Sequence, residues 1–438
     1  MGGLCATHAK DGWRFDLGGH RFVSSDAELS AWLEDLLGDD LLVQERRSIV
    51  LHEGRQFRYP LEARDLLKNL GIRENAQALA GYARARVDTR IAKVRGTPRD
   101  RSFEDWVTAR FGRPLYDTFF GPYTHKLWGI HPSKISADWA QERISLLHLG
   151  DAALRMAGMG GDPIRTYARR YRYPRLGMGQ LYDAIAAEVV RLGGSVLTET
   201  RVVGLEVAGD RVTAVNAVGP TGALRIPVGE LLSTIPLPEL ARSLEPSAAV
   251  PAVDALRFRA LTFLNLMLAR PDFSENTWMY VASGGLRTSR IQEPKRRSVA
   301  MAPDGRTSIM LEIPCDVGDA IWTASVPELQ ARMDGELRTL GFTVDDVLDA
   351  FVVRVEHGYP IYHLGYEDDR QALLKRVARF QNVRTAGRQG LFRYVFMDAA
   401  MQMGMRAAMQ MTRGEPSGVG LDAIGRASSP IETRAITA

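Results

Sequence analysis

The chain has few cysteines, no long apolar run and no paired histidines, and each of these absences narrows its class. Cys5 and Cys315 are its only cysteines, so a disulfide framework is excluded and a reducing, cytoplasmic location is expected. No apolar stretch approaches the ~20 residues that span a bilayer, which predicts no integral membrane segment. The eight histidines show no ligand-like pairing, so the sequence predicts no metal site.

The composition is that of a folded protein with more than one domain. Hydrophobic residues make up 45% and charged residues 25% of the 438 positions, which excludes a disordered chain. A chain of this length exceeds a typical single core, so two or three interleaved domains are expected. The formal net charge of +4 favours an anionic small-molecule ligand slightly and does not indicate nucleic-acid binding. It leaves the oligomeric state open.

Strand-like and helical segments alternate in an order that indicates an α/β protein with α+β insertions. Leu231–Pro236 is typical of a short buried strand with a proline stop, and the stretch after 413 is rich in Gly, Ser and Pro and is predicted to be disordered. The predicted helices are 29–37, 103–111, 181–192, a helical pair within 326–352 and a methionine-rich helix after 398. The predicted strands form a hairpin over 203–215, several more between 255 and 315, and a last one over 384–388.

Basic residues interleave with tyrosines between positions 165 and 175. Such a pattern can bind single-stranded nucleic acid by stacking and charge. It can also be a solvated, positively charged loop that steers an anionic substrate. We favour the loop, because the run leads directly into the motif at Tyr173–Gly179 described below.

Paired glycines near the start of the chain are typical of a cofactor-binding turn. Gly2-Gly3 precede a strand-like stretch that ends in Gly18-Gly19-His20, and two adjacent glycines allow a backbone to approach a flat ring closely. This segment looks like the second half of a flavin-binding Rossmann unit. The G-x-G-x-x-G turn that opens such a unit is absent from the 438 residues, so the sequence predicts a cofactor domain without its first half. A misplaced start codon would explain the gap.

Seven strings in order resemble the flavin amine oxidoreductases, in the branch of UDP-galactopyranose mutase and protoporphyrinogen oxidase. They lie at 15–20, 59–60, 103–143, 173–179, 278–290, 358–360 and 387–398. The resemblance covers residues 2 to about 412 and implies a Rossmann-like FAD-binding domain, a helical insertion and a β-sheet substrate domain. The implied boundaries are 1–60 (partial FAD domain), 61–172 (helical insertion), 173–240 (FAD domain), 241–380 (β-rich substrate domain with the helical pair), 381–412 (FAD domain) and 413–438 (tail).

The resemblance also implies roles for particular residues. In such mutases reduced FAD attacks the sugar through a ring nitrogen while the nucleotide diphosphate leaves, and two arginines clamp the diphosphate. The matching substrate-binding positions are Arg290 and Arg388 with Tyr59, Tyr280, Tyr359 and Tyr394, and the matching catalytic positions are His20 and Arg143. The matching FAD-binding positions are Gly2, Gly3, Gly18, Gly19, His20, Val202, Gly387 and Asp398.

Elementary chemistry supports such a clamp and leaves other functions open. Guanidinium forks bind diphosphate oxygens bidentately, each charge-assisted bond contributing roughly 1.5–3 kcal/mol. Leu61-Glu62 stand where an aromatic–glutamine pair holds uracil in eukaryotic mutases, and Asp398 is typical of redox members. The alternatives are therefore a net FAD-dependent oxidoreductase of the amine-oxidase, protoporphyrinogen-oxidase or desaturase kind, or a truncated non-catalytic remnant. The arginines could also form plain ion pairs, the tyrosines could be packing residues, and Asp398 could be a helix N-cap.

Overall fold

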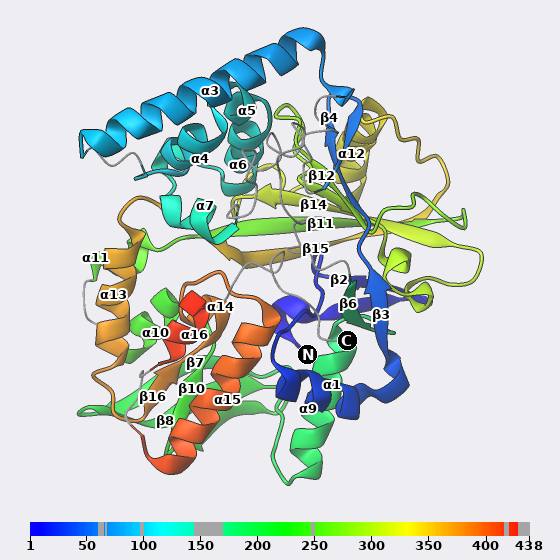
Figure 1. Cartoon of the computed structure of the whole chain (residues 1–438). Coiled ribbons are helices and arrows are strands. Elements are labelled where there is room, and N and C mark those ends of the chain that lie inside the picture. Colours follow the sequence, from blue (N-terminus) through cyan, green and yellow to red (C-terminus); the bar gives the residue numbers. More distant parts are fainter. Residues whose placement is uncertain are drawn as a thin grey trace.

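The computed structural model describes residues 1–59, 65, 68–96, 100–143, 170–246, 250–415 and 420–427. Figure 1 shows a broad sheet across the middle of the molecule, a group of helices above it and a mixed α/β part below it. The N-terminus lies in the lower part, beside α1 (Ala27–Leu37) and α9 (Gly179–Arg191). The predicted α/β class with a large inserted sheet is confirmed.

The central sheet has seven strands in the order β15-β11-β14-β13-β12-β4-β5. β12 pairs with β4 in parallel, and the other neighbours are antiparallel. Segments more than 200 residues apart in sequence therefore form one surface. The strands are β4 (Ser48–His52), β5 (Arg55–Arg58), β11 (Phe258–Leu268), β12 (Trp278–Val281), β13 (Arg290–Gln292), β14 (Thr307–Cys315) and β15 (Val347–Pro360).

The sheet separates two apolar cores. Because side chains alternate along a strand, Phe263 of β11 belongs to the core beneath the helical insertion, whereas the next residue, Leu264, belongs to the opposite core. Leu329 and Met333 of α12 (Val326–Thr339) cover this second face. The insertion on the first face comprises α3 (Ile72–Val94), α4 (Phe103–Phe111), α5 (Arg113–Leu115), α6 (Gly121–Trp128) and α7 (Ala137–Arg143).

The lower part contains a small parallel pairing of β10 (Leu231–Ser233) with β16 (Val383–Thr385), so the chain returns there after the substrate-domain segment. One apolar core contains buried residues from Trp13 to Phe392, so it extends over most of the predicted domains. The predicted domain boundaries therefore stay predictions. The other strands here are β1 (Thr7–Lys10), β2 (Trp13–Asp16), β3 (Leu41–Glu45), β6 (Arg170–Pro174), β7 (Arg201–Ala208), β8 (Arg211–Gly219) and β9 (Gly222–Pro227). The remaining helices are α10 (Leu237–Leu244), α11 (Pro251–Ala255), α13 (Tyr366–Val377), α14 (Gly387–Gly390), α15 (Met397–Arg413) and α16 (Leu421–Ala427).

Two local predictions were wrong because strand pairing overrides local pattern. The predicted helical pair within 326–352 contains only one helix, α12, and residues from Val347 onward form β15 along β11. The predicted loop at 165–175 contains β6 over Arg170–Pro174, paired with β3, while 165–169 lie outside the described residues. Tyr171 and Tyr173 of β6 point into the core and Arg170 is exposed, as the period of two requires.

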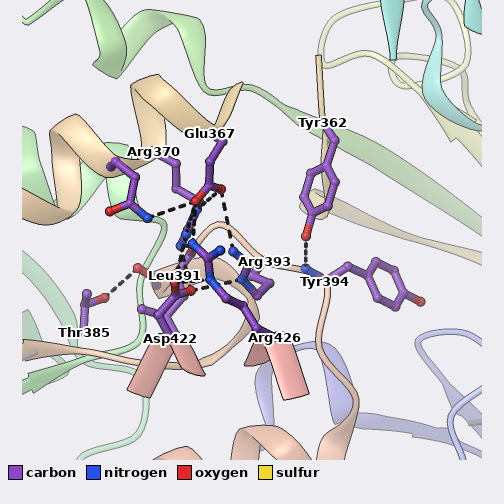
Figure 2. Close-up of polar contacts among 11 residues, drawn as sticks. Tyr362, Glu367, Arg370, Thr385, Leu391, Arg393, Tyr394, Asp422 and Arg426 are labelled. Carbon is purple, nitrogen blue, oxygen red and sulfur yellow. Dashed lines mark hydrogen bonds and ion pairs between the residues drawn. The ribbon is translucent and has the colours of Figure 1, made fainter. Parts of the chain in front are cut away.

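The predicted disordered tail was also wrong over 420–427, where α16 packs against the body of the protein. Residues 416–419 and 428–438 lie outside the described part. Figure 2 shows why α16 is a folded helix: its Asp422 joins an ion network with Glu367 and Arg370 of α13. A composition-based expectation cannot detect such a tertiary contact.

Arg370 is the centre of this network. Its fully buried guanidinium donates two bonds of 2.8 Å to Glu367 and bonds of 2.9 and 3.0 Å to Asp422. Arg393 and Arg426 also contact both carboxylates. Burial alone would raise the pKa of Glu367, but its bonds from Arg370 and Gln371 outweigh burial and lower that pKa to about 2.

Replacing Asp422→Asn is expected to lower the free energy of unfolding by about 2–3 kcal/mol, because Arg370 loses one of its two carboxylate partners while remaining buried. Urea unfolding followed by circular dichroism measures the change. The control is Asp254→Asn, which breaks an exposed ion pair with Arg242 and should cost less than ~0.5 kcal/mol. Equal effects of the two substitutions would contradict a stabilising network.

The same network predicts a loss of stability in acid. The folded-state pKa of Glu367 lies below the unfolded value of roughly 4.3, so its contribution is complete above pH ~4.3 and disappears as the pH falls through about 2. Unfolding midpoints measured from pH 6 to pH 2 should therefore fall less steeply in Glu367→Gln than in the wild-type protein. Parallel curves would show that Glu367 does not contribute.

Candidate functional site

A buried carboxylate, an arginine and a tyrosine from three strands of the central sheet form the centre of the candidate site. Arg290 of β13 is the cross-strand neighbour of Glu312 on β14, and its Nη2 lies 3.0 Å from Glu312 Oε1. The Tyr359 hydroxyl at the end of β15 donates to the same oxygen at 3.0 Å. Glu312 is fully buried, so these two donors stabilise its negative charge.

The Gly18-Gly19 turn after β2 packs directly against this triad. A Cβ atom on Gly19 would lie 2.8 Å from Arg290 Nη1, and one on Gly18 would lie 3.6 Å from Glu312 Oε2. Gly18 also has a φ of 110°, which disfavours other residues. The structure thus gives these glycines a role in admitting the Arg290 side chain, and their predicted contact with a flat ring stays a prediction.

His20 follows the turn and carries no charge near neutral pH. Burial, together with the charges of Arg388, Arg297 and Arg290, lowers the pKa of His20 to about 3. Its Nδ1 is buried and has no hydrogen-bond partner among the described residues. The site therefore presents a neutral imidazole surrounded by guanidinium groups.

Arg388 approaches the triad from the other side. It lies at the start of α14, its Nη2 donates to the Val395 carbonyl at 3.0 Å, and its guanidinium lies 4.1 Å from the Tyr394 ring centroid. Tyr394 stacks on Tyr359 with 5.6 Å between ring centroids. An unbroken series of contacts therefore joins the two predicted clamp arginines.

Tyr280 and Tyr59 form an aromatic wall beside Arg290. The Arg290 guanidinium lies 5.5 Å from the centroid of the Tyr280 ring, and Tyr59 packs on Tyr280 at 4.6 Å. Tyr123 of α6 meets Tyr280 edge-on at 6.5 Å. The six predicted substrate-binding residues are thus connected to one another through described contacts.

Three further residues of the site were not predicted from the sequence: Glu312, Tyr123 and Arg297. Glu312 is the one carboxylate of the fully buried strand β14, with Leu311 and Ile313 on either side of it, and this isolated acid was the available signal. Tyr123 lies within a string that the resemblance already covered. Arg297 is buried, and its Nη2 donates to Gln292, but nothing in its local sequence distinguishes it from a surface arginine.

The other predicted cofactor residues are more dispersed. Val202 lies on β7 and is half exposed. Gly2 adopts a φ of 100° beside Tyr182, and Gly387 opens α14 with a φ of 81°. Asp398 is buried in the first turn of α15, whose N-cap is Phe396, so Asp398 itself is not the cap.

Arg143 ends α7, and its side chain lies outside the described part. Gly3 has a positive φ of 54°, and a Cβ there would meet no described atom within 4 Å. These positions are compatible with an extended cofactor site, but they do not converge as the substrate residues do.

The sequence profile of the flavin-containing amine oxidoreductases matches residues 1–412. The chain belongs to this family. A structure of reduced UDP-galactopyranose mutase aligns with a TM-score of 0.77 at 19% identity, covering 96% of this chain and 90% of that chain. A putative protoporphyrinogen oxidase from Exiguobacterium sp. 255-15 aligns with a TM-score of 0.67 at 16% identity, covering 93% and 90%. A putrescine oxidase redesigned in its cofactor binding aligns with a TM-score of 0.60 at 14% identity, covering 94% of this chain and 91% of that chain.

The cofactor of the family is FAD, which supplies two-electron chemistry when bound. The residues present fit a flavin. His20 Nδ1 is a buried polar atom that lacks a described partner, and open space lies beside the backbone of Gly3 and Gly387. The positive charges of Arg290 and Arg388 can stabilise an electron-rich ring. Among the described helices, none has the length and apolarity that crossing a membrane requires.

Replacing Gly19→Ala is expected to displace the Arg290 guanidinium and to lower the free energy of unfolding by about 1–3 kcal/mol, because the new methyl group overlaps Nη1. Chemical denaturation measures the effect. Gly404→Ala on α15 is the matched control: its Cβ would meet no described atom within 4 Å, and alanine should stabilise the helix by roughly 0.5–1 kcal/mol. A stable Gly19→Ala protein would show that the contact is loose.

Proposed function

We propose that this protein is an FAD-dependent enzyme that acts on a diphosphate-linked sugar, either as a mutase or as a redox variant of one. The observation that carries the proposal is the positive field around His20. The three charged groups that lower its pKa are all guanidiniums, namely Arg388, Arg297 and Arg290. Such a field favours an anionic substrate.

The charge balance supports this choice. Glu312 compensates Arg290, but neither Arg388 nor Arg297 has a carboxylate partner within 4.0 Å among the described residues. Tyrosine hydroxyls at the site add hydrogen-bond donors without adding charge. A bound diphosphate would balance the surplus positive charge, and the same groups would stabilise the charge that develops as it leaves.

A second candidate is a net oxidoreductase that uses FAD to take hydride from an amine, a ring or a polyene. The full burial of Glu312 against Arg290 favours it, because a paired arginine attracts an anion less strongly than a free one. The structures of a UDP-galactopyranose mutase and of a putrescine oxidase both share this fold. The fold therefore does not decide between the two candidate functions. The two candidates differ in their need for an electron acceptor.

Replacing both Arg290→Met and Arg388→Met in the FAD-bound protein should weaken binding of UDP-galactose by at least ~100-fold, because each guanidinium contributes roughly 1.5–3 kcal/mol to a diphosphate contact. Isothermal titration calorimetry measures this binding. GDP-mannose is a second probe, because the proposal does not specify the nucleotide base of the substrate. Arg413→Met is the control, since this arginine is exposed at the end of α15. Binding that survives the double substitution would remove the proposal.

Turnover separates the two candidates. A mutase needs only a catalytic amount of reductant and consumes no oxygen. Oxygen uptake in proportion to product formed, with putrescine or another amine as substrate, would favour the oxidoreductase.

A further inference from the structure

Lys126 of α6 is a partly buried lysine whose three donors all bind the end of β12 and the loop that follows it. Its Nζ donates to the carbonyls of Val281, Ser283 and Thr288 at 2.7, 2.9 and 3.0 Å. An ammonium group has three N–H donors, so each is satisfied by a backbone oxygen. Val281 is the last residue of β12, and Ser283 and Thr288 belong to the loop that connects β12 to β13.

A carboxylate holds the same loop through its amides. Glu336 of α12 accepts from the Arg287 N–H at 2.6 Å and from the Thr288 N–H at 2.9 Å. Thr288 is fully buried and is thus bound through its carbonyl by Lys126 and through its amide by Glu336. A cation on the carbonyls and an anion on the amides fix the loop, which we call the hairpin tip (residues 282–289).

The hairpin tip lies between two residues of the candidate site. Tyr280 is the last but one residue of β12, Arg290 is the first residue of β13, and these two are paired in the strand register. α6 also carries Tyr123, which packs against Tyr280. A shift of the hairpin tip would therefore move Arg290 relative to Glu312 and Tyr359.

We propose that Lys126 is a positioning residue, which fixes the hairpin tip and thereby holds Tyr280 and Arg290 in place. The significance of this for substrate binding rests on the function proposed above. The effect of Lys126 on the hairpin tip does not depend on that function. No contact between Lys126 and substrate is implied.

The protonation state of Lys126 predicts that the order of the hairpin tip depends on pH. Burial lowers the pKa of Lys126 to about 7, and the nearby Glu336 carboxylate opposes this shift. Lys126 also acts on His52 of β4, whose other charged neighbours are Glu53, Arg55 and Glu74, and the hairpin tip itself carries Arg287. A neutral amine has two N–H donors for three carbonyls. The hairpin tip should therefore loosen as the pH rises through about 7.

Global stability should change in the opposite direction through this group. The folded-state pKa lies below that of a free lysine, so the unfolded chain binds the proton more tightly between pH ~7 and ~10. Relative to Lys126→Met, the wild-type protein should gain stability over that range. A local loosening accompanied by a global gain distinguishes positioning from simple stabilisation.

Hydrogen–deuterium exchange of the full-length, FAD-bound protein tests the proposal. In Lys126→Met, protection factors of peptides covering 281–290 should fall by about tenfold, and in the wild-type protein they should fall between pH 6 and pH 8. Lys126→Arg should restore much of the protection and remove its pH dependence, because a guanidinium stays charged. Lys134→Met is the control, since Lys134 is an exposed lysine. Lys126→Gln serves if the methionine variant does not fold.

Unchanged protection at 281–290 in the methionine or glutamine variant would overturn the proposal. UDP-galactose titrations of the same samples address the proposed function separately. If the wild-type protein binds the probe, Lys126→Met should weaken that binding by about tenfold. If the wild-type protein does not bind it, the function fails while the exchange data still decide the role of Lys126.

Discussion

The buried carboxylate of Glu312 is the constraint around which the centre of the molecule is arranged. A charged group without partners in such an environment would cost several kcal/mol, so its neighbours have to supply donors. Arg290 and the Tyr359 hydroxyl do this from the strands on either side of the site. The absence of a side chain at Gly19 leaves space for the arginine. Arg290 and Tyr359, which the sequence predicted as separate substrate-binding residues, thus form one charged group with Glu312.

This charged group also contributes to the low pKa of His20, because Arg290 is one of the charges that lower it. One carboxylate cannot balance the guanidiniums that surround the imidazole, and burial prevents water from screening them. The surplus charge is therefore available to a cofactor or substrate. The family assignment accounts for the flavin.

The sequence predicted those parts of the protein that local pattern determines. The hairpin around Gly209 and the stripe of Phe103 in α4 are where they were expected, because turn chemistry and helical periodicity act over a few residues. β15 was mistaken for a helix, because its pairing with β11 is not encoded locally. α16 was missed for the same reason, since its order depends on Arg370, fifty-two residues earlier.

The candidate site follows the same rule. Motif resemblance found the arginines and tyrosines that line it, because such strings are short and can be matched one by one. Glu312 remained hidden among apolar neighbours, and only the register of β13 and β14 makes it the partner of Arg290. Pairwise relations between distant strands are the information that a single sequence does not supply.

The parallel pairing of β4 with β12 has a consequence for how the protein is made. Ser48–Leu51 emerge from the ribosome some 230 residues before Trp278–Val281, the strand beside which they finally lie. Contacts of such long range close late and fold slowly. During much of translation, β4 therefore has an edge whose backbone groups lack their strand partner. A nascent chain in this state is prone to aggregation and depends on chaperones.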